Sequence, residues 1–335
     1  MPPLDMAMTA RSEHPGGNKG RSNRPWRCTV PTSTSSTGPG QDSVLSAEPE
    51  SHPPGQGDPP ARAVLVGVDG GQCALAAVRW AADEAQRRSA PLRIVHAAPY
   101  VGRQSDHGTP SPELHRARRI TAQAYTVARH TSADVHAVTE VVPGEPARVL
   151  LAEAPEAELI VLGIATTGAL DELVAASVAQ RVAGHTGTPV VVVPRSRTLE
   201  PGGRPIAALL GLGDPEDDEP VVEFAASTAR RSGAPLLVVR PHGRRAEAAD
   251  VDWAARLSDL DVTVHDVPSD APRELLKAVS PTPLVVLSAG HGSMLHRSLD
   301  GAHRYLLRHC TSPMALIPSV HRTGSGVHEE EVAAG

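Results

Sequence analysis

The chain has 335 residues, a formal net charge of −6 and 40% hydrophobic residues, but only one Phe, three Tyr and three Trp. This length favours about two domains, whose cores must be packed with Val, Leu, Ile and Ala. The acidic balance disfavours nucleic acid or an anionic membrane as the main partner, and no apolar window of about 20 residues predicts a membrane span.

The first 60 residues are rich in Pro, Gly, Ser and Thr and carry no periodic apolar face. Such a composition cannot bury enough apolar surface to offset the entropy of ordering. We therefore expect a disordered N-terminal tail over 1–60 and a shorter C-terminal tail over 320–335. The basic residues of 11–27 leave three interpretations of the tail open. It could be an arm that binds nucleic acid weakly, a solvated tail, or the product of a start codon assigned upstream of the true domain.

Between residues 61 and 195, apolar strands alternate with amphipathic helices. Strands alternating with helices imply right-handed crossovers, so this stretch predicts a doubly wound parallel sheet of five strands. The expected strands are Ala63–Val68, Leu92–Ala97, Val135–Val141, Leu159–Leu162 and Val190–Val193, and the expected helices are Ala74–Arg88, Pro112–His130, Glu145–Ala154 and a stretch within Ala169–His185.

The same unit then occurs a second time. Trp80 matches Phe224 and Pro91 matches Pro235, both 144 residues later. A second match pairs 142–162 with 267–287 at a spacing of 125, so the copy lacks about 19 residues (144 − 125) before its third strand. Such self-similarity predicts two tandem α/β domains, at 61–195 and 204–319. Strands of the copy are expected near 206–211, 235–239, 262–266, 284–287 and 314–317.

Four segments of the chain together resemble the universal stress protein family in its tandem two-domain, actinobacterial form. They are VLVGVDGG, LIVLGIATTG, ASVAQRVAGHTGTP and the closing VVVVP, and the resemblance covers 61–195 well and 204–319 more weakly. It implies a strand order of 3-2-1-4-5 in each domain, a cytoplasmic location, dimers formed through the last strand, and ATP binding in one subset of members. Three unpatterned cysteines also suit a reducing cytoplasm.

In such a sheet a ligand binds where the strand order reverses, at the carboxyl ends of the first and fourth strands. The family's phosphate-binding pattern has glycines at two positions that Thr166 and Ala176 occupy in this sequence. Gly168 could compensate for this loss if the pattern is shifted in register. A second interpretation is that Asp69 merely caps the first helix and Gly163 merely turns the chain. The candidate nucleotide-binding residues are Asp69, Gly70, Val95, Gly163, Thr166, Gly168, Ala176, Ser177 and Val178.

The second domain departs further from the pattern. Asp69 matches Gly213, with Asp214 one residue later, and Gly163 matches Ser288. The acidic run 216–219 follows its first strand. Acidic residues at a helix start ordinarily complement the helix dipole in solvent, but four of them would also repel a triphosphate. We therefore expect ATP in the first domain only.

No motif of a familiar enzyme class occurs: there is no P-loop lysine, no G-x-S-x-G elbow and no H-E-x-x-H zinc site. We expect a stress-response or regulatory module that works by binding, with weak ATP affinity and an unidentified protein partner, and with no metal. Two alternatives stay open: an ATP-binding stress protein with slow hydrolysis, and a scaffold without nucleotide. Strands Val190–Val193 and Met314–Ile317 are expected to pair, either inside one chain as a pseudo-dimer or between two chains as a homodimer.

Overall fold

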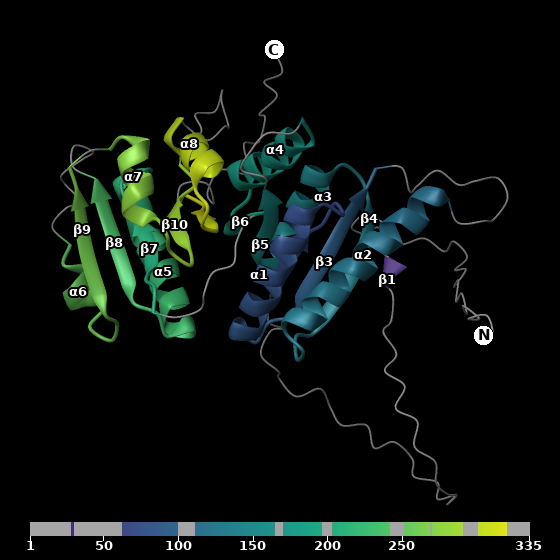
Figure 1. Cartoon of the computed structure of the whole chain (residues 1–335), viewed down its shortest axis with the longest axis horizontal. Coiled ribbons are helices and arrows are strands. Elements are labelled where there is room, and N and C mark those ends of the chain that lie inside the picture. Colours follow the sequence, from purple (N-terminus) through teal and green to yellow (C-terminus); the bar gives the residue numbers. More distant parts are fainter. Residues whose placement is uncertain are drawn as a thin grey trace, which may run out of the picture.

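The computed structural model describes residues 28–29, 62–99, 111–164, 170–195, 203–241, 251–268, 270–290 and 301–319, with backbone alone at 28–29 and 170–177. The described strands form a single sheet of eleven, with helices on both of its faces (Figure 1). This confirms the predicted α/β class and its doubly wound sets of strands. The two tails expected to be disordered lie outside the described residues, apart from 28–29.

The first half of the molecule, residues 62–195, has the strand order β4-β3-β2-β5-β6, all parallel, which is the predicted 3-2-1-4-5. A two-residue strand, β1, pairs antiparallel with β4. The elements are β1 (Cys28–Thr29), β2 (Ala63–Gly67), α1 (Gln72–Arg88), β3 (Leu92–Ala98), α2 (Pro112–Thr131), β4 (Ala137–Pro143), α3 (Pro146–Glu153), η1 (Ala154–Glu156), β5 (Ala157–Ile164), α4 (Leu170–His185) and β6 (Val190–Pro194).

Strand β2 is apolar throughout because both of its faces are covered. Val64 and Val66 join a core that contains residues of α1 and α2, whereas Leu65 joins a core that contains residues of α3 and α4. This alternation is what a continuous apolar run in a doubly wound sheet predicts. Helix α1 ends at Arg88, and its C-cap residue Ser89 adopts the left-handed conformation with φ 53°.

The second half, residues 203–319, repeats the order as β11-β10-β7-β8-β9. The predicted shortening lies before its third strand, where the described residues hold only the four-residue α6 in place of the 20-residue α2. The elements are β7 (Ile206–Leu209), η2 (Pro215–Asp217), α5 (Asp218–Ser232), β8 (Leu236–Pro241), α6 (Trp253–Arg256), β9 (Val262–Val267), α7 (Pro272–Val279), β10 (Val285–Ser288), α8 (Gly301–His309) and β11 (Met314–Ile317).

The two halves join through their fifth strands. Strands β6 and β11 pair antiparallel, with Met314 opposite Val192 and Leu316 opposite Val190. Of the two expected modes, the structure therefore contains the pairing inside one chain. Because the pairing is antiparallel, the halves are related by an approximate two-fold axis, and they lie side by side in Figure 1. Among the described helices, none is long and apolar enough to cross a membrane.

A buried arginine fixes α3 against the sheet. Arg93 of β3 donates to Glu140 of β4 at 2.9 and 3.1 Å and to Glu153 of α3 at 2.7 Å. Burial acts to lower the pKa of Arg93, but hydrogen bonds and the charges of the two glutamates outweigh it and raise that pKa overall. The guanidinium thus stays charged and holds one end of α3.

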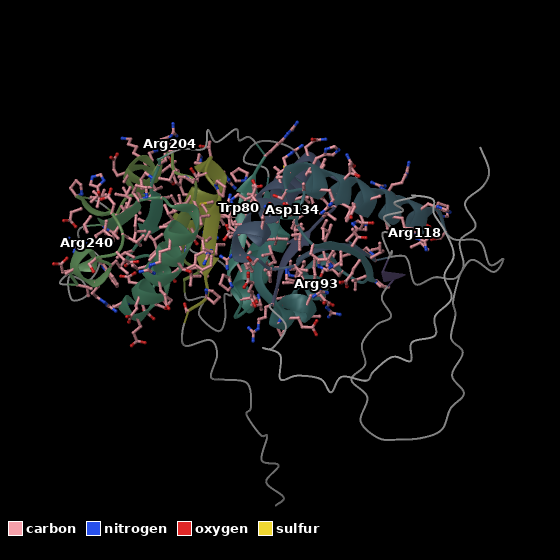
Figure 2. All side chains as sticks on the ribbon, turned by 90° about the horizontal axis from the view of Figure 1, so that it is seen from below. Trp80, Arg93, Arg118, Asp134, Arg204 and Arg240 are labelled. Carbon is pink, nitrogen blue, oxygen red and sulfur yellow. The ribbon has the colours of Figure 1, made fainter. Side chains whose placement is uncertain are left out.

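A second buried ion cluster lies where α1 meets α5, beside the strand junction. Glu84, whose side chain is 1% exposed, accepts from Arg88 at 2.7 Å and from Arg87 at 2.9 Å, and lies 3.5 Å from Arg231 of α5. The Arg88 guanidinium carbon is 5.4 Å from the centre of the Phe224 ring. Burial, and then the charge of Arg88, lowers the pKa of Arg231. Figure 2 places Trp80, also on α1, at this meeting of the halves.

Replacing Glu84 by Ala should lower the free energy of unfolding by about 3–5 kcal/mol, because Arg88 and Arg231 would face each other without their shared anion. Urea unfolding followed by circular dichroism measures this. Glu219→Ala is the control: Glu219 is exposed and pairs with Arg256 at 2.6 Å, so its loss should cost less than about 1 kcal/mol. Equal costs for the two variants would contradict a role for Glu84 in joining the halves.

Candidate functional site

A cavity of about 140 Å³ opens at the carboxyl ends of β2, β3 and β5, where the strand order reverses. This is the position at which open α/β sheets bind their ligands. Its walls are mainly apolar. They are formed by Gly67, Val68, Asp69, Ala74, Val95, His96, Ala97, Pro146, Leu150, Leu162, Gly163 and Val178.

Four of the nine predicted site residues line this cavity: Asp69, Val95, Gly163 and Val178. Gly70 lies beside it with φ +91°, and a Cβ there would sit 2.9 Å from Ile120 of α2, so only glycine fits. The other four predicted residues fall on parts of the chain without described side chains. Thr166 and Gly168 lie outside the described residues, and Ala176 and Ser177 have only their backbone described. The ligand-binding role of all nine stays a prediction.

Asp69 lies just before the first helix but does not cap it, because the N-cap residue of α1 is Gly71 and no side chain caps that helix. Its Oδ1 accepts a hydrogen bond of 2.7 Å from the N–H of Gly71, the residue that precedes α1. The side chain is exposed, and no hydrogen bond to Oδ2 occurs within the described residues. One carboxylate oxygen therefore shapes the loop, while the other remains available to a ligand.

Gly163 is required by the fold itself. A Cβ at this position would collide with the backbone of Cys73 and Ala74 in the first turn of α1. The sequence suggested that this glycine lets a phosphate approach the chain or turns it. In the structure, what approaches is the helix backbone, which packs directly on the end of β5. This places the amino terminus of α1 at the cavity.

Sequence reasoning missed the other eight cavity residues, among them His96, Ala97 and Pro146. Strand β3 extends beyond the end of β2. The last residues that pair between the two strands are Gly67 of β2 and Val95 of β3. Backbone groups on a strand alternate in direction, so the N–H and C=O of Ala97 face the same side as those of Val95, beyond the end of the β2 ladder. One donor and one acceptor thus face the cavity. Pro146 begins α3, which Glu145 caps by accepting from Ala147 and Arg148.

In the second half, side chains fill the equivalent point. Asp217, which is 2% exposed, accepts hydrogen bonds of 3.0 Å from the hydroxyls of Ser288 and Ser319 and one of 3.2 Å from the Asp214 N–H. A Cβ at Gly213 would collide with the Asp217 and Ser288 side chains. Two members of the acidic run, Asp217 and Asp218, are thus buried, which corrects the expectation of a solvated run.

The comparisons with known proteins agree with this geometry. The model of the universal stress protein family matches residues 60–194. The universal stress protein Rv3134c of Mycobacterium tuberculosis is 31% identical over 212 residues, which cover 61% of this chain and 74% of that protein. The chain belongs to the universal stress protein family.

Solved structures extend the likeness to both halves. A universal stress protein from Archaeoglobus fulgidus matches 76% of this chain and 96% of its own with a TM-score of 0.60 at 12% identity, which shows the shared fold. A universal stress protein solved in complex with cAMP is 26% identical and spans 41% of this chain and 100% of its own, with a TM-score of 0.32.

The buried acid Asp218 makes stability depend on pH. Burial raises the pKa of Asp218, a hydrogen bond of 2.9 Å from the Gly211 N–H opposes this, and the charge of Asp217 raises the pKa further. A carboxyl whose folded-state pKa is raised destabilises the fold when ionised. That cost is present at neutral pH and disappears as the pH falls through the folded-state pKa toward the ordinary value of 3.8.

Asp218→Asn should therefore raise the free energy of unfolding at pH 7, because the amide oxygen can still accept from Gly211 and carries no charge. The advantage over the wild type should shrink steadily as the pH is lowered to 4. Urea unfolding at pH 7, 5.5 and 4 measures the difference. A variant that is less stable at pH 7, or an advantage that does not change with pH, would contradict the assignment.

Proposed function

We propose that the first half binds an adenine nucleotide, ATP or a shorter relative, in the cavity at the ends of β2, β3 and β5. The chain would act in the cytoplasm as a stress-response regulatory module that works by binding. The observation that carries this proposal is an open, largely apolar cavity that has Asp69 and the Ala97 backbone at its rim, at the reversal of strand order. The domain limits 61–195 and 204–319 belong to the same proposal.

The size and polarity of the cavity suit a flat aromatic ring. An apolar cavity of about 150 Å³ holds benzene, so 140 Å³ can admit one ring of the base, while the rest of the base, the sugar and the phosphates lie at the open mouth. Adenine presents an amino donor next to a ring-nitrogen acceptor. The C=O and N–H of Ala97 supply the complementary acceptor and donor. The free oxygen of Asp69 can then accept from a ribose hydroxyl.

The phosphates would lie at the amino terminus of α1. Its first turn contains no acidic residue, and the N–H groups at a helix amino terminus favour an anion. The expected contribution of Thr166, Gly168, Ala176 and Ser177 remains part of the proposal. Because Thr166 and Ala176 replace two glycines of the family pattern, they add side chains where the backbone would approach the phosphates. We therefore expect weak affinity for a triphosphate.

The second half binds no nucleotide in this proposal. The Asp217 carboxylate and the Ser288 side chain occupy the point that corresponds to the cavity rim, and both are buried. A ligand would have to break three hydrogen bonds to Asp217 and accept a negative charge beside its phosphates. Among the described residues that line the first cavity, only Asp69 and His96 have ionisable side chains, and we expect the site to bind a nucleotide without hydrolysing it.

Titration calorimetry of the full chain with ATP and AMP tests the proposal. Asp69→Asn keeps an oxygen for the Gly71 N–H but places an amide donor where the ribose needs an acceptor, so affinity should fall at least tenfold, or about 1.4 kcal/mol. The affinity of the Asp69→Ala variant should fall by the same factor. Asp214→Ala, in the matching loop of the second half, should leave affinity unchanged. Equal losses from Asp69 and Asp214 variants, or no loss from either, would place the site elsewhere.

A further inference from the structure

The outer edge of β4 accepts an added strand in this structure. Strand β4 pairs with β3 at all seven of its residues. Its other edge carries the N–H and C=O groups that β3 does not bind, and such an edge is a template for a further strand. Strand β1 uses two positions of this edge, with Cys28 opposite Val141 and Thr29 opposite Glu140 (Figure 1). The occupant comes from the N-terminal tail, outside the first half of the molecule.

Strand β4 carries no exposed charge along this edge. Exposed charges ordinarily keep an edge strand from pairing with another chain. The single charged residue of β4 is Glu140, which is buried and is bound by Arg93 of β3. Its charge is thus neutralised inside the molecule and would not oppose a further strand. The neighbouring Val141 is buried as well and packs with Ala98 and Ala117. Without a cover, this edge would therefore be open to pairing.

The equivalent edge of the second half is protected in a different way. Strand β9 ends the sheet, and within the residues that the structure describes no strand pairs with its outer side. It carries His265 and Asp266, both exposed, and Asp266 accepts a hydrogen bond of 2.8 Å from Arg240. A further strand on this edge would have to remove water from these polar groups. Of the two terminal edges, the one without exposed charge is thus the one that β1 covers.

The sequence around β1 suits a short covering strand. Residues 26–30 read Trp-Arg-Cys-Thr-Val, and Trp, Thr and Val are favoured in strands. Pro25 and Pro31 bracket this stretch. Because proline cannot donate a ladder hydrogen bond, the two prolines keep an added strand short. A very short strand at the end of a sheet offers little edge of its own to another chain.

We propose that the N-terminal segment at Cys28–Thr29 is a cover for the edge of β4, and that it prevents a second copy of this chain from pairing there. A second copy fits the uncovered edge because two identical β4 strands can pair antiparallel about a two-fold axis. Residues 30–61 join the segment to the first half, so its pairing is intramolecular and is favoured by a high effective concentration. Two pairs of residues make a weak contact, which depends on this attachment. Edge protection does not depend on nucleotide binding.

Cys28→Pro combined with Thr29→Pro, made in the full chain, tests the proposal because it removes both N–H groups of β1 and leaves the two halves unchanged. The matched control is Thr34→Pro combined with Ser35→Pro, in the same tail but outside β1. At low protein concentration, the β4 amides that face β1 should exchange with deuterium about tenfold faster in the first variant than in the wild type. Analytical ultracentrifugation should show that this variant dimerises about tenfold more tightly. The control should match the wild type in both measurements.

The concentration dependence identifies the surface that pairs. As the concentration of the first variant is raised, protection of the same amides should return, because β4 of a second copy then replaces β1. Unchanged exchange in the first variant would show that β1 does not cover the edge, and it would overturn the proposal. Faster exchange without tighter dimerisation, or a dimer whose β4 amides stay unprotected, overturns the protective role. A dimeric wild type that the first variant makes monomeric would show that β1 pairs with a second copy, which overturns the intramolecular cover.

Discussion

The antiparallel pairing of β6 with β11 is the constraint from which the rest of the structure follows. All residues of β6 and β11 are buried, and each of these fifth strands hydrogen-bonds to the edge of the other. Neither therefore offers a free edge for association with other chains. The pairing also sets α1 beside α5, where Glu84 meets arginines of both halves. One chain thereby obtains the arrangement that a single-domain relative would need two chains to build.

Joining two copies in one chain allows them to diverge in role. The same crevice recurs twice, and the two versions differ at several positions, among them Asp69, which becomes Gly213, Cys73, which becomes Asp217, and Gly163, which becomes Ser288. In the first version the strand ends stay open. In the second, Asp217 connects η2 to β10 and to Ser319 after β11 through buried hydrogen bonds. A site that can hold a ligand in one half is thus a structural contact in the other.

Much of the fold could be predicted because its strands are apolar runs bounded by Gly and Pro. The strand Met314–Ile317 has the predicted bounds, and the change in repeat spacing located the shortened connection that holds α6. The site was less predictable. The contact of Gly163 with α1, the bond between His96 and Val68, and the burial of Asp217 all depend on packing between segments distant in sequence, which periodicity does not encode. The exposure of the Ala97 backbone to the cavity depends on how far β3 extends beyond the end of β2.

The central claim is that one half is open to a nucleotide and the other is closed. Native mass spectrometry of the full chain, titrated with AMP and ATP, tests it most directly because it counts bound molecules per chain. The account predicts that binding saturates at one nucleotide per chain. Saturation at two would show that the Asp217 contacts do not close the second crevice, and the absence of any bound nucleotide at saturating concentration would show that the first crevice is not a nucleotide site.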